Sequence, residues 1–197
     1  AKIGGRCDCS EINVGGSVKV NVGKIQRVSV GGAFKAEGAV EIEEIDVGGA
    51  AKVGEGSNVA SVDVGGSFKS EGGISFGSID VGGAVKLGGS SKGGTIDVGG
   101  SVKVDGDLEL TGDLDVGGKV TVNGDFKCEQ KIKVGGTLIV DGKIHTFRII
   151  VGGRIEADRT YAEDGFRVGR RSEVKGFVES GEILVRERSR VESLYGD

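Results

Sequence analysis

The tripeptide Val-Gly-Gly occurs nine times in this 197-residue chain, and its regular spacing constrains the fold more than any other feature. Successive copies begin 16 to 18 residues apart, most of them 17. A period this constant is typical of a repeat protein in which each repeat stacks on the next. The valines that open the nine copies are Val14, Val30, Val47, Val64, Val81, Val98, Val116, Val134 and Val151.

Each repeat has alternating apolar and polar residues around the glycine pair, as in Ile96-Asp97-Val98 before it and Val102-Lys103-Val104 after it. A third alternating segment is clearest at Leu108-Glu109-Leu110. Alternation with a period of two predicts short strands with one buried face. A repeat of this length leaves no room for a helical crossover, so equivalent strands are expected to stack in parallel. We therefore predict an all-β fold, a right-handed, three-faced parallel β-helix (solenoid) of about 17 residues per rung and roughly eleven rungs.

The 40 glycines fall mainly at the expected corners, and proline is absent. We expect glycine to supply a left-handed or otherwise strained backbone at each corner, where a side chain would clash. The absence of proline suits a chain in which nearly every backbone N–H is paired, because proline removes a donor.

The whole chain, residues 1–197, is expected to form a single β-helix domain. Residues 1–13 would be a short first rung, 14–157 the regular Val-Gly-Gly rungs, and 158–197 a divergent, arginine-rich end. The formal net charge of −4 gives no signal for nucleic acid, and none is expected as a partner. Nothing resembles a signal peptide or a membrane span, so a cytoplasmic location is expected. The chain starts at Ala1 and contains no methionine, which fits a removed initiator or a piece of a longer protein.

Two cysteines lie near the N-terminus, and an alignment on Gly4-Gly5 places Cys7 and Cys9 where Val18 and Val20 fall one rung later. On this alignment the first rung lacks its third face. The pair is either half of a metal site or a redox pair, or it is two small apolar residues in the core. The register and the usual burial of cysteine favour the core. Neighbouring inward residues of one strand are poorly placed for a disulfide, and the third cysteine is many rungs away.

Two sets of like charges are expected to line up along the outside of the coil. The lysines are Lys19, Lys35, Lys52, Lys69, Lys86 and Lys103, and the aspartates are Asp46, Asp63, Asp80, Asp97 and Asp115. Equivalent positions in stacked strands lie about 4.8 Å apart, so like charges come close together. The lysines are a candidate docking face for a polyanion or an anionic membrane, and the aspartates a candidate calcium site. A solvated surface, on which lysines discourage lateral sheet pairing, is favoured over both.

The last rungs keep the period but change the consensus. Residues 166–174, Phe-Arg-Val-Gly-Arg-Arg-Ser-Glu-Val, align with residues 183–191, seventeen positions later. Clustered arginines suit phosphate or RNA, but the interspersed acidic residues favour paired surface charge. His145, the one histidine, is expected to point into solvent.

Neither end of the sequence shows a helix or a polar segment that would cap the coil. An uncapped β-helix exposes unpaired backbone groups and apolar core, and natural solenoids usually cover them. Such a coil is expected to stack on another, and stacking that does not close generates a filament. The expected interface consists of inward residues of the end rungs, namely Ile3, Cys7, Cys9, Val185, Val191, Leu194 and Tyr195.

A single-domain β-helix with a period near seventeen, glycine-marked corners and few caps resembles the bactofilins, a polymer-forming cytoskeletal family of prokaryotes. The segment Val-Gly-Arg-Arg-Ser-Glu-Val at residues 168–174 is most similar to that family. The resemblance implies a non-enzymatic, right-handed β-helix that polymerises end to end without nucleotide and scaffolds partner proteins, often at membranes. The chain departs from the family in its strict Val-Gly-Gly corners and in lacking polar, proline-rich tails.

Enzymes built on β-helices need residues that this sequence does not supply. Hexapeptide acyltransferases need strict six-residue units and a catalytic histidine in a trimeric cleft, whereas the spacing here is not hexapeptide and His145 has no evident partner. The related carbonic anhydrases need three histidines for zinc, and the chain has one. Polysaccharide lyases need aspartates grouped on long loops and exposed aromatic residues. We expect a structural protein that self-assembles end to end, with no enzymatic activity and no cofactor. The alternative is a monomeric binding or spacer module that docks a polyanion or a protein through its lysine or arginine face.

Overall fold

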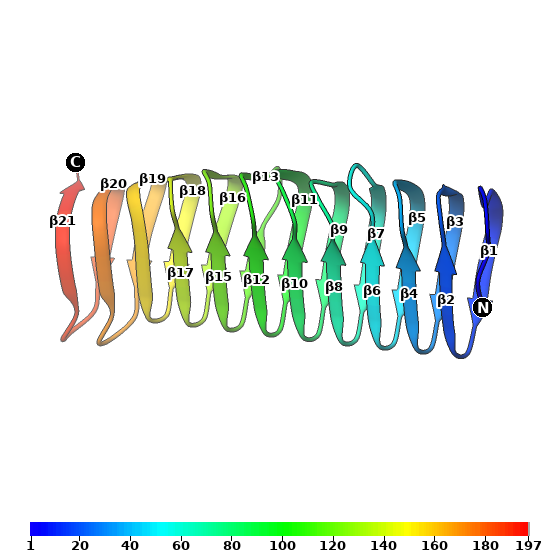
Figure 1. Ribbon diagram of the computed structural model, residues 1–197. Coiled ribbons are helices and arrows are strands. Elements are labelled where there is room, and N and C mark those ends of the chain that lie inside the picture. The colour runs from blue at the N-terminus through cyan, green and yellow to red at the C-terminus, as the bar shows by residue number, and fades with distance from the viewer. Residues whose placement is uncertain (197) are drawn as a thin grey trace.

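The computed structural model describes residues 1–196, which form one continuous parallel coil of 21 strands (Figure 1). The coil completes about 11 turns of about 17 residues, which confirms the predicted parallel β-helix. In Figure 1 the chain rises through the front strands, descends behind them and advances to the left with each turn, so the coil is right-handed. The described residues contain no helix, and thus none long and apolar enough to cross a membrane.

The first face is formed by the short strands that follow each Gly-Gly pair. Their alternate residues point into the core, as Val102 and Val104 do, and both are buried. The strands are β2 (Ser17–Val20), β4 (Ala33–Ala36), β6 (Ala50–Val53), β8 (Ser67–Ser70), β10 (Ala84–Leu87), β12 (Ser101–Val104), β15 (Lys119–Val122) and β17 (Thr137–Val140).

The second and third faces are joined in most rungs by one strand that bends between them. We predicted separate strands, and this was wrong for most rungs, because the bend can use a single residue such as Gln26, with pairing resumed at Arg27. One rung keeps separate strands, β13 (Leu108–Leu110) and β14 (Leu114–Val116). The bent strands are β1 (Cys9–Val14), β3 (Gly23–Val30), β5 (Val40–Val47), β7 (Asn58–Val64), β9 (Ser75–Val81), β11 (Ser91–Val98), β16 (Phe126–Val134) and β18 (Lys143–Val151).

The three strands nearest the C-terminus are longer and pass around the corners without a break. The strands β19 (Arg154–Val168) and β20 (Glu173–Val185) each cover all three faces, and β21 (Arg190–Gly196) covers the first and second. The change of consensus in this region therefore alters the corners and leaves the coil intact.

Equivalent residues of successive rungs stack directly on one another. On the first face, Phe34 pairs with Ala51, Ala51 with Phe68, and Phe68 with Val85, and all four side chains are buried. Large side chains therefore alternate with small ones along the axis, so the core is filled without overpacking.

The second face is filled in the same way near Gly93, where the sequence has almost no apolar residues. A Cβ atom at Gly93 would lie 2.1 Å from the ring of Phe76, which pairs with Gly93 from the preceding rung. The buried Ser91 hydroxyl accepts a hydrogen bond from the Ile74 N–H at 3.2 Å and donates one to the Gly89 carbonyl at 3.1 Å. This wall is therefore packed, whereas its composition suggests a loose one.

The Gly-Gly corners need glycine because of the neighbouring rung. None of the glycines in the nine Val-Gly-Gly corners has a positive φ, so the left-handed conformation considered for them is absent, whereas the expected clash of a side chain is confirmed from the second of these corners onward. A Cβ atom at Gly82 would lie 2.6 Å from the Gly65 carbonyl oxygen, and one at Gly83 would lie 2.2 Å from that of Gly66. Cβ atoms essentially never approach backbone this closely, so the stacked corners exclude side chains.

The first rung has a different register from the one that the sequence suggested. Lys2 pairs with Lys19 on the first face, and Cys9 pairs with Ile25 on the second. Cys7 and Cys9 therefore belong to the second face, and their alignment with Val18 and Val20 was wrong. The cause is Gly4-Gly5, which forms the corner between the first and second faces and not the Val-Gly-Gly corner. The third face, thought to be missing, is present from Ile12 to Val14.

Candidate functional site

The N-terminal end of the coil presents partly covered core residues. The Ile3 N–H donates to the Lys19 carbonyl at 2.8 Å, and the Cys7 N–H donates to the Val22 carbonyl at 2.8 Å. Cys7 is buried, while Ile3 and Cys9 pack against the core and remain partly exposed. Their outer sides have no neighbour among residues 1–196, because every strand paired with this rung lies on its C-terminal side.

The two N-terminal cysteines are core residues, as predicted. Their sulfur atoms lie 3.6 Å apart and both thiols are free. Burial, and then the hydrogen bond with Cys9, raise the pKa of the Cys7 thiol, so the protonated form is favoured. Cys128 is buried in β16, far along the coil, and its thiol donates to the Gly112 carbonyl at 3.2 Å. Within the described chain no three His, Cys, Asp or Glu side chains are grouped to hold a metal ion.

The C-terminal end is more open. Leu194 pairs with Val178, which is 1% exposed, so Leu194 occupies a core position, yet 41% of its surface is accessible. Val191 pairs with the buried Val174 and is itself partly exposed, as is Val185. The last strand thus shows apolar side chains that a further rung would bury.

Tyr195 does not share this position. It pairs with Glu179, which pairs with Tyr161, which pairs with His145. All four side chains point outward from the second face, and Tyr195 is 58% exposed. The prediction that Tyr195 points inward was wrong, because the strand alternation places Leu194 inside and its neighbour outside.

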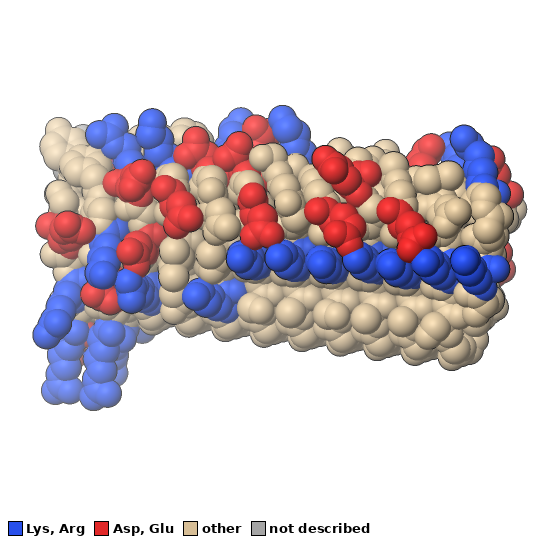
Figure 2. Space-filling model, viewed as in Figure 1, with Lys and Arg blue, Asp and Glu red and all other residues tan. Residues whose placement is uncertain are grey.

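The lysines form a longer row than the sequence suggested. Lys2 pairs with Lys19, so it precedes the six predicted residues, and its spacing of 17 was the signal that could have revealed it. We call this set the lysine row, and in Figure 2 it is the continuous blue line along the first face. Its members are Lys2, Lys19, Lys35, Lys52, Lys69, Lys86 and Lys103.

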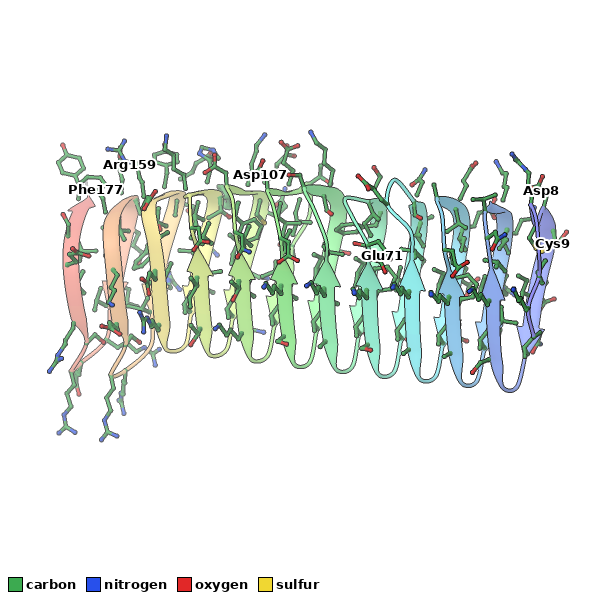
Figure 3. The ribbon with its side chains drawn as sticks, in the orientation of Figure 1. Asp8, Cys9, Glu71, Asp107, Arg159 and Phe177 are labelled. Atoms are coloured by element: carbon green, nitrogen blue, oxygen red, sulfur yellow. The ribbon has the colours of Figure 1, made fainter. Side chains whose placement is uncertain are left out.

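Three carboxylates at the corner beside the lysine row neutralise part of its charge. Glu37 contacts Lys19 and Lys35, Asp105 contacts Lys86 and Lys103, and Glu71 contacts Lys52 (Figure 3). Hydrogen bonds from the paired lysines lower the pKa values of Glu37 and Asp105. The row therefore keeps an excess of positive charge.

The predicted aspartates also stack in register on the third face, and we call them the aspartate row: Asp46, Asp63, Asp80, Asp97 and Asp115. Asp115 forms an ion pair with Lys133 at 2.6 Å, at the point where the row ends. The other four carboxylates have no ion-pair partner among residues 1–196. The side chains are outward and solvated, as the sequence predicts.

The arginines of the last rungs divide into two groups. Arg154 and Arg167 form ion pairs with glutamates, and the Arg159 guanidinium lies 5.1 Å above the Phe177 ring (Figure 3). Arg171 and Arg188 instead occupy long corners with positive φ. The expected pairing of surface charge thus holds at strand positions such as Arg154 and Arg167, whereas the corner residues Arg171 and Arg188 are exposed.

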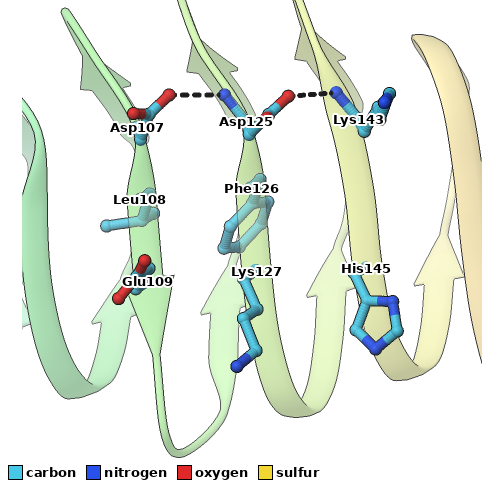
Figure 4. Close-up of a pocket in the computed structure, with 8 residues that line it drawn as sticks. All are labelled: Asp107, Leu108, Glu109, Asp125, Phe126, Lys127, Lys143 and His145. Carbon is cyan, nitrogen blue, oxygen red and sulfur yellow. Dashed lines mark hydrogen bonds between the residues drawn. The ribbon is translucent and has the colours of Figure 1, made fainter.

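A hollow of about 510 Å³ lies on the second face over β13, β16 and β18 (Figure 4). Its aspartates connect successive rungs: Asp107 accepts a hydrogen bond from the Asp125 N–H, and Asp125 accepts one from the Lys143 N–H, both at 2.8 Å. His145 is exposed, as predicted, and stacks on Tyr161 with ring centroids 5.0 Å apart. These carboxylates hold the coil together, and the hollow brings no nucleophile and base within hydrogen-bonding distance.

Comparison with protein families identifies the class to which this coil belongs. Residues 96–194, half of the chain, match the family model of Bactofilin, described as polymer-forming cytoskeletal. No curated protein and no solved structure gives a match. The match begins within β11 and extends into β21, so it includes the C-terminal end and the arginine-rich rungs. The chain therefore belongs to the bactofilin family of polymer-forming cytoskeletal proteins.

Proposed function

We propose that this protein is a structural, non-enzymatic component of the cytoplasm that stacks end to end into filaments. The terminal rungs would meet so that the coil continues from one copy into the next, without nucleotide or cofactor. Inward residues at the two ends, Ile3, Cys7 and Cys9 at one and Val185, Val191 and Leu194 at the other, would become core. The filament would then serve as a scaffold for other proteins, including ones at membranes.

The contrast between Leu194 and Val178 carries this proposal. The two residues share one core position in successive rungs, and only the outer one is exposed. An added rung would cover it and would also pair the free backbone edge of β21. Family membership supports the same function, because bactofilins are described as polymer-forming.

The substitution Leu194→Glu tests the proposal. It would place an unpaired carboxylate inside the junction, where removal from water costs about 3–5 kcal/mol. We expect the protein concentration needed for filaments to rise at least about a hundredfold, since each 1.4 kcal/mol is a factor of ten. Electron microscopy and sedimentation of the purified chain measure this directly.

Leu184→Glu is the matched control. The exposed fraction of Leu184, 43%, is similar to that of Leu194, 41%. Leu184, however, points outward from the third face, in register with Arg167. We expect this variant to form filaments as the parent does. Stacking through the C-terminal rung would be contradicted if Leu194→Glu formed normal filaments, or if both variants lost filament formation to the same extent.

A second candidate function uses the lysine row, whose seven positive charges meet only three carboxylates. A monomer could dock a polyanion or an acidic protein there. A parent chain that stays monomeric, and binds an anionic matrix in a salt-dependent way, would favour this function over filaments.

A further inference from the structure

The lysine row and the aspartate row lie on either side of the same edge of the coil. In each rung an aspartate precedes the glycine pair and a lysine follows it, as Asp80 and Lys86 do around Gly82-Gly83. The edge itself, formed by the Gly-Gly corners, carries no charge and appears in Figure 2 as a smooth band beside the lysine row. The two rows therefore face in different directions, on two faces that diverge from one edge.

Towards the glycine edge the lysine row is flanked by small side chains, and the central aspartates are flanked by serines, which leaves these positions accessible to a flat partner. Beside the lysines on the first face lie Ser67, Ala84 and Ser101, and beside the aspartates on the third face lie Ser61 and Ser78. No bulky residue separates successive charges. A second flat surface could therefore approach either row closely enough for direct ion pairs.

The charges of the two rows are incompletely compensated within one molecule. Lys69 has no carboxylate within ion-pair distance among residues 1–196, and the same part of the chain offers no cation to Asp46, Asp63, Asp80 or Asp97. Both rows repeat with the spacing of adjacent parallel strands, about 4.8 Å. A lysine row and an aspartate row from two copies therefore match charge for charge along several rungs.

We propose that the lysine row of one copy docks on the aspartate row of a second copy, so that coils associate side by side. Like rows repel, and two copies cannot engage both rows at once, because the rows lie on faces that diverge from a convex edge. The contact is therefore heterologous and leaves each copy with one free row for a further copy. It produces lateral arrays in which neighbouring coils share the glycine edge.

The inference goes beyond end stacking and does not depend on it. The rows run from Lys2 to Asp115, and most of their members precede residue 96, where the family match begins. In the next rung, Lys133 takes the position of Asp115 on the third face, and Thr121 takes the position of Lys103 on the first face. Both charged rows therefore end at about the same level along the coil. Lateral contact is thereby confined to the rungs between Lys2 and Asp115.

Charge reversal tests the proposal in the background of Leu194→Glu, where end stacking is disfavoured. One variant carries Asp63→Lys, Asp80→Lys and Asp97→Lys, and the other carries Lys52→Glu, Lys69→Glu and Lys86→Glu. In each variant the central positions of both rows carry the same sign, so each variant alone should remain monomeric in sedimentation at low salt. In an equimolar mixture of the two variants, the dissociation constant should return to within about tenfold of that of the Leu194→Glu chain without charge reversal. High salt should abolish the association.

The matched control reverses three lysines of the second face, Lys24→Glu, Lys92→Glu and Lys127→Glu, and should associate as the parent does. A parent that stays monomeric at low salt, or a mixture that does not associate, would overturn the proposal. Filaments seen by electron microscopy report end stacking separately, so the two proposals fail independently.

Carbodiimide cross-linking of the parent chain provides a second measurement should a triple variant not fold. With equal amounts of ¹⁵N-labelled and unlabelled protein, cross-links between copies carry both isotopes. We expect mixed-isotope links that join the lysine row to the aspartate row, for example Lys69 to Asp80. Links confined to other lysines and carboxylates would exclude the docking.

Discussion

At the scale of single residues, the corners depend on the absence of two Cβ atoms in each rung. A Cβ atom at Gly83 would lie 2.2 Å from the Gly66 carbonyl oxygen, whereas one at Gly16 would meet nothing within 4 Å. We therefore predict that Gly83→Ala lowers the free energy of unfolding by about 1–3 kcal/mol through overpacking. Gly16→Ala should leave it unchanged or raise it slightly, because alanine restricts the unfolded chain.

Thermal unfolding followed by circular dichroism would compare the two alanine variants at low protein concentration. Both glycines hold the second position of a Val-Gly-Gly corner and neither has a positive φ, so the variants differ only in what lies beneath them. Equal destabilisation by both would mean that backbone conformation, and not the stacked rung, requires glycine at the corners.

At the scale of a strand position, the lysine row places like charges in adjacent strands. Although Lys52 contacts Glu71, partial burial and then the charges of Lys69 and Lys35 lower its pKa. The folded state thus disfavours the protonated form of Lys52. This penalty is present in full below the folded pKa and is relieved as the pH rises through it towards the unfolded value.

We predict that Lys69→Thr raises the stability at low salt by a few tenths of a kcal/mol to about 1 kcal/mol. Lys69 lies between Lys52 and Lys86 without a carboxylate, and the row itself ends in threonine at Thr121. Lys103→Thr should not have this effect, because Lys103 contacts Asp105 at 3.3 Å. The gain should fade at high salt in thermal unfolding, and a gain independent of salt would exclude repulsion as its cause.

At this same scale, the sequence correctly predicted the strand pairings and the charged rows at positions that can be aligned on the Val-Gly-Gly motif. The pairing of Val81 with Val98 follows from this motif, as do both charged rows. The prediction of register failed where a glycine pair occurs without the preceding valine. Gly4-Gly5 copies the glycine pair at another corner, which moved Cys7 and Cys9 to the wrong face.

The candidate interface was predictable only in part for a related reason. Alternation within a strand fixes which of two neighbours points inward only when the register with the next strand is known. In β21 that register places Leu194 opposite Val178, so Tyr195 lies outside. We also missed that one continuous strand serves the second and third faces. Nothing in the composition of a one-residue bend distinguishes it from a longer corner.

At the scale of the whole molecule, the proposed end stacking would be the same kind of contact as the stacking of rungs within one coil. Each corner Cβ points towards the preceding rung, so Gly16 has open space only because no rung precedes its corner among the described residues. A copy that continues the coil from the N-terminal end would place its own corner there. Gly16→Ala should therefore spare the monomer and disturb assembly, raising the protein concentration needed for filaments by about tenfold or more.

Ser17→Ala is the control for this last prediction, since alanine already occupies the equivalent positions Ala33, Ala50 and Ala84. It should change neither stability nor assembly, as judged by filament length in electron microscopy and by sedimentation. If Gly16→Ala forms filaments as readily as Ser17→Ala, the corner backbone is not continuous across the junction. Filaments would then join through the inward side chains of the end rungs, with their corners apart.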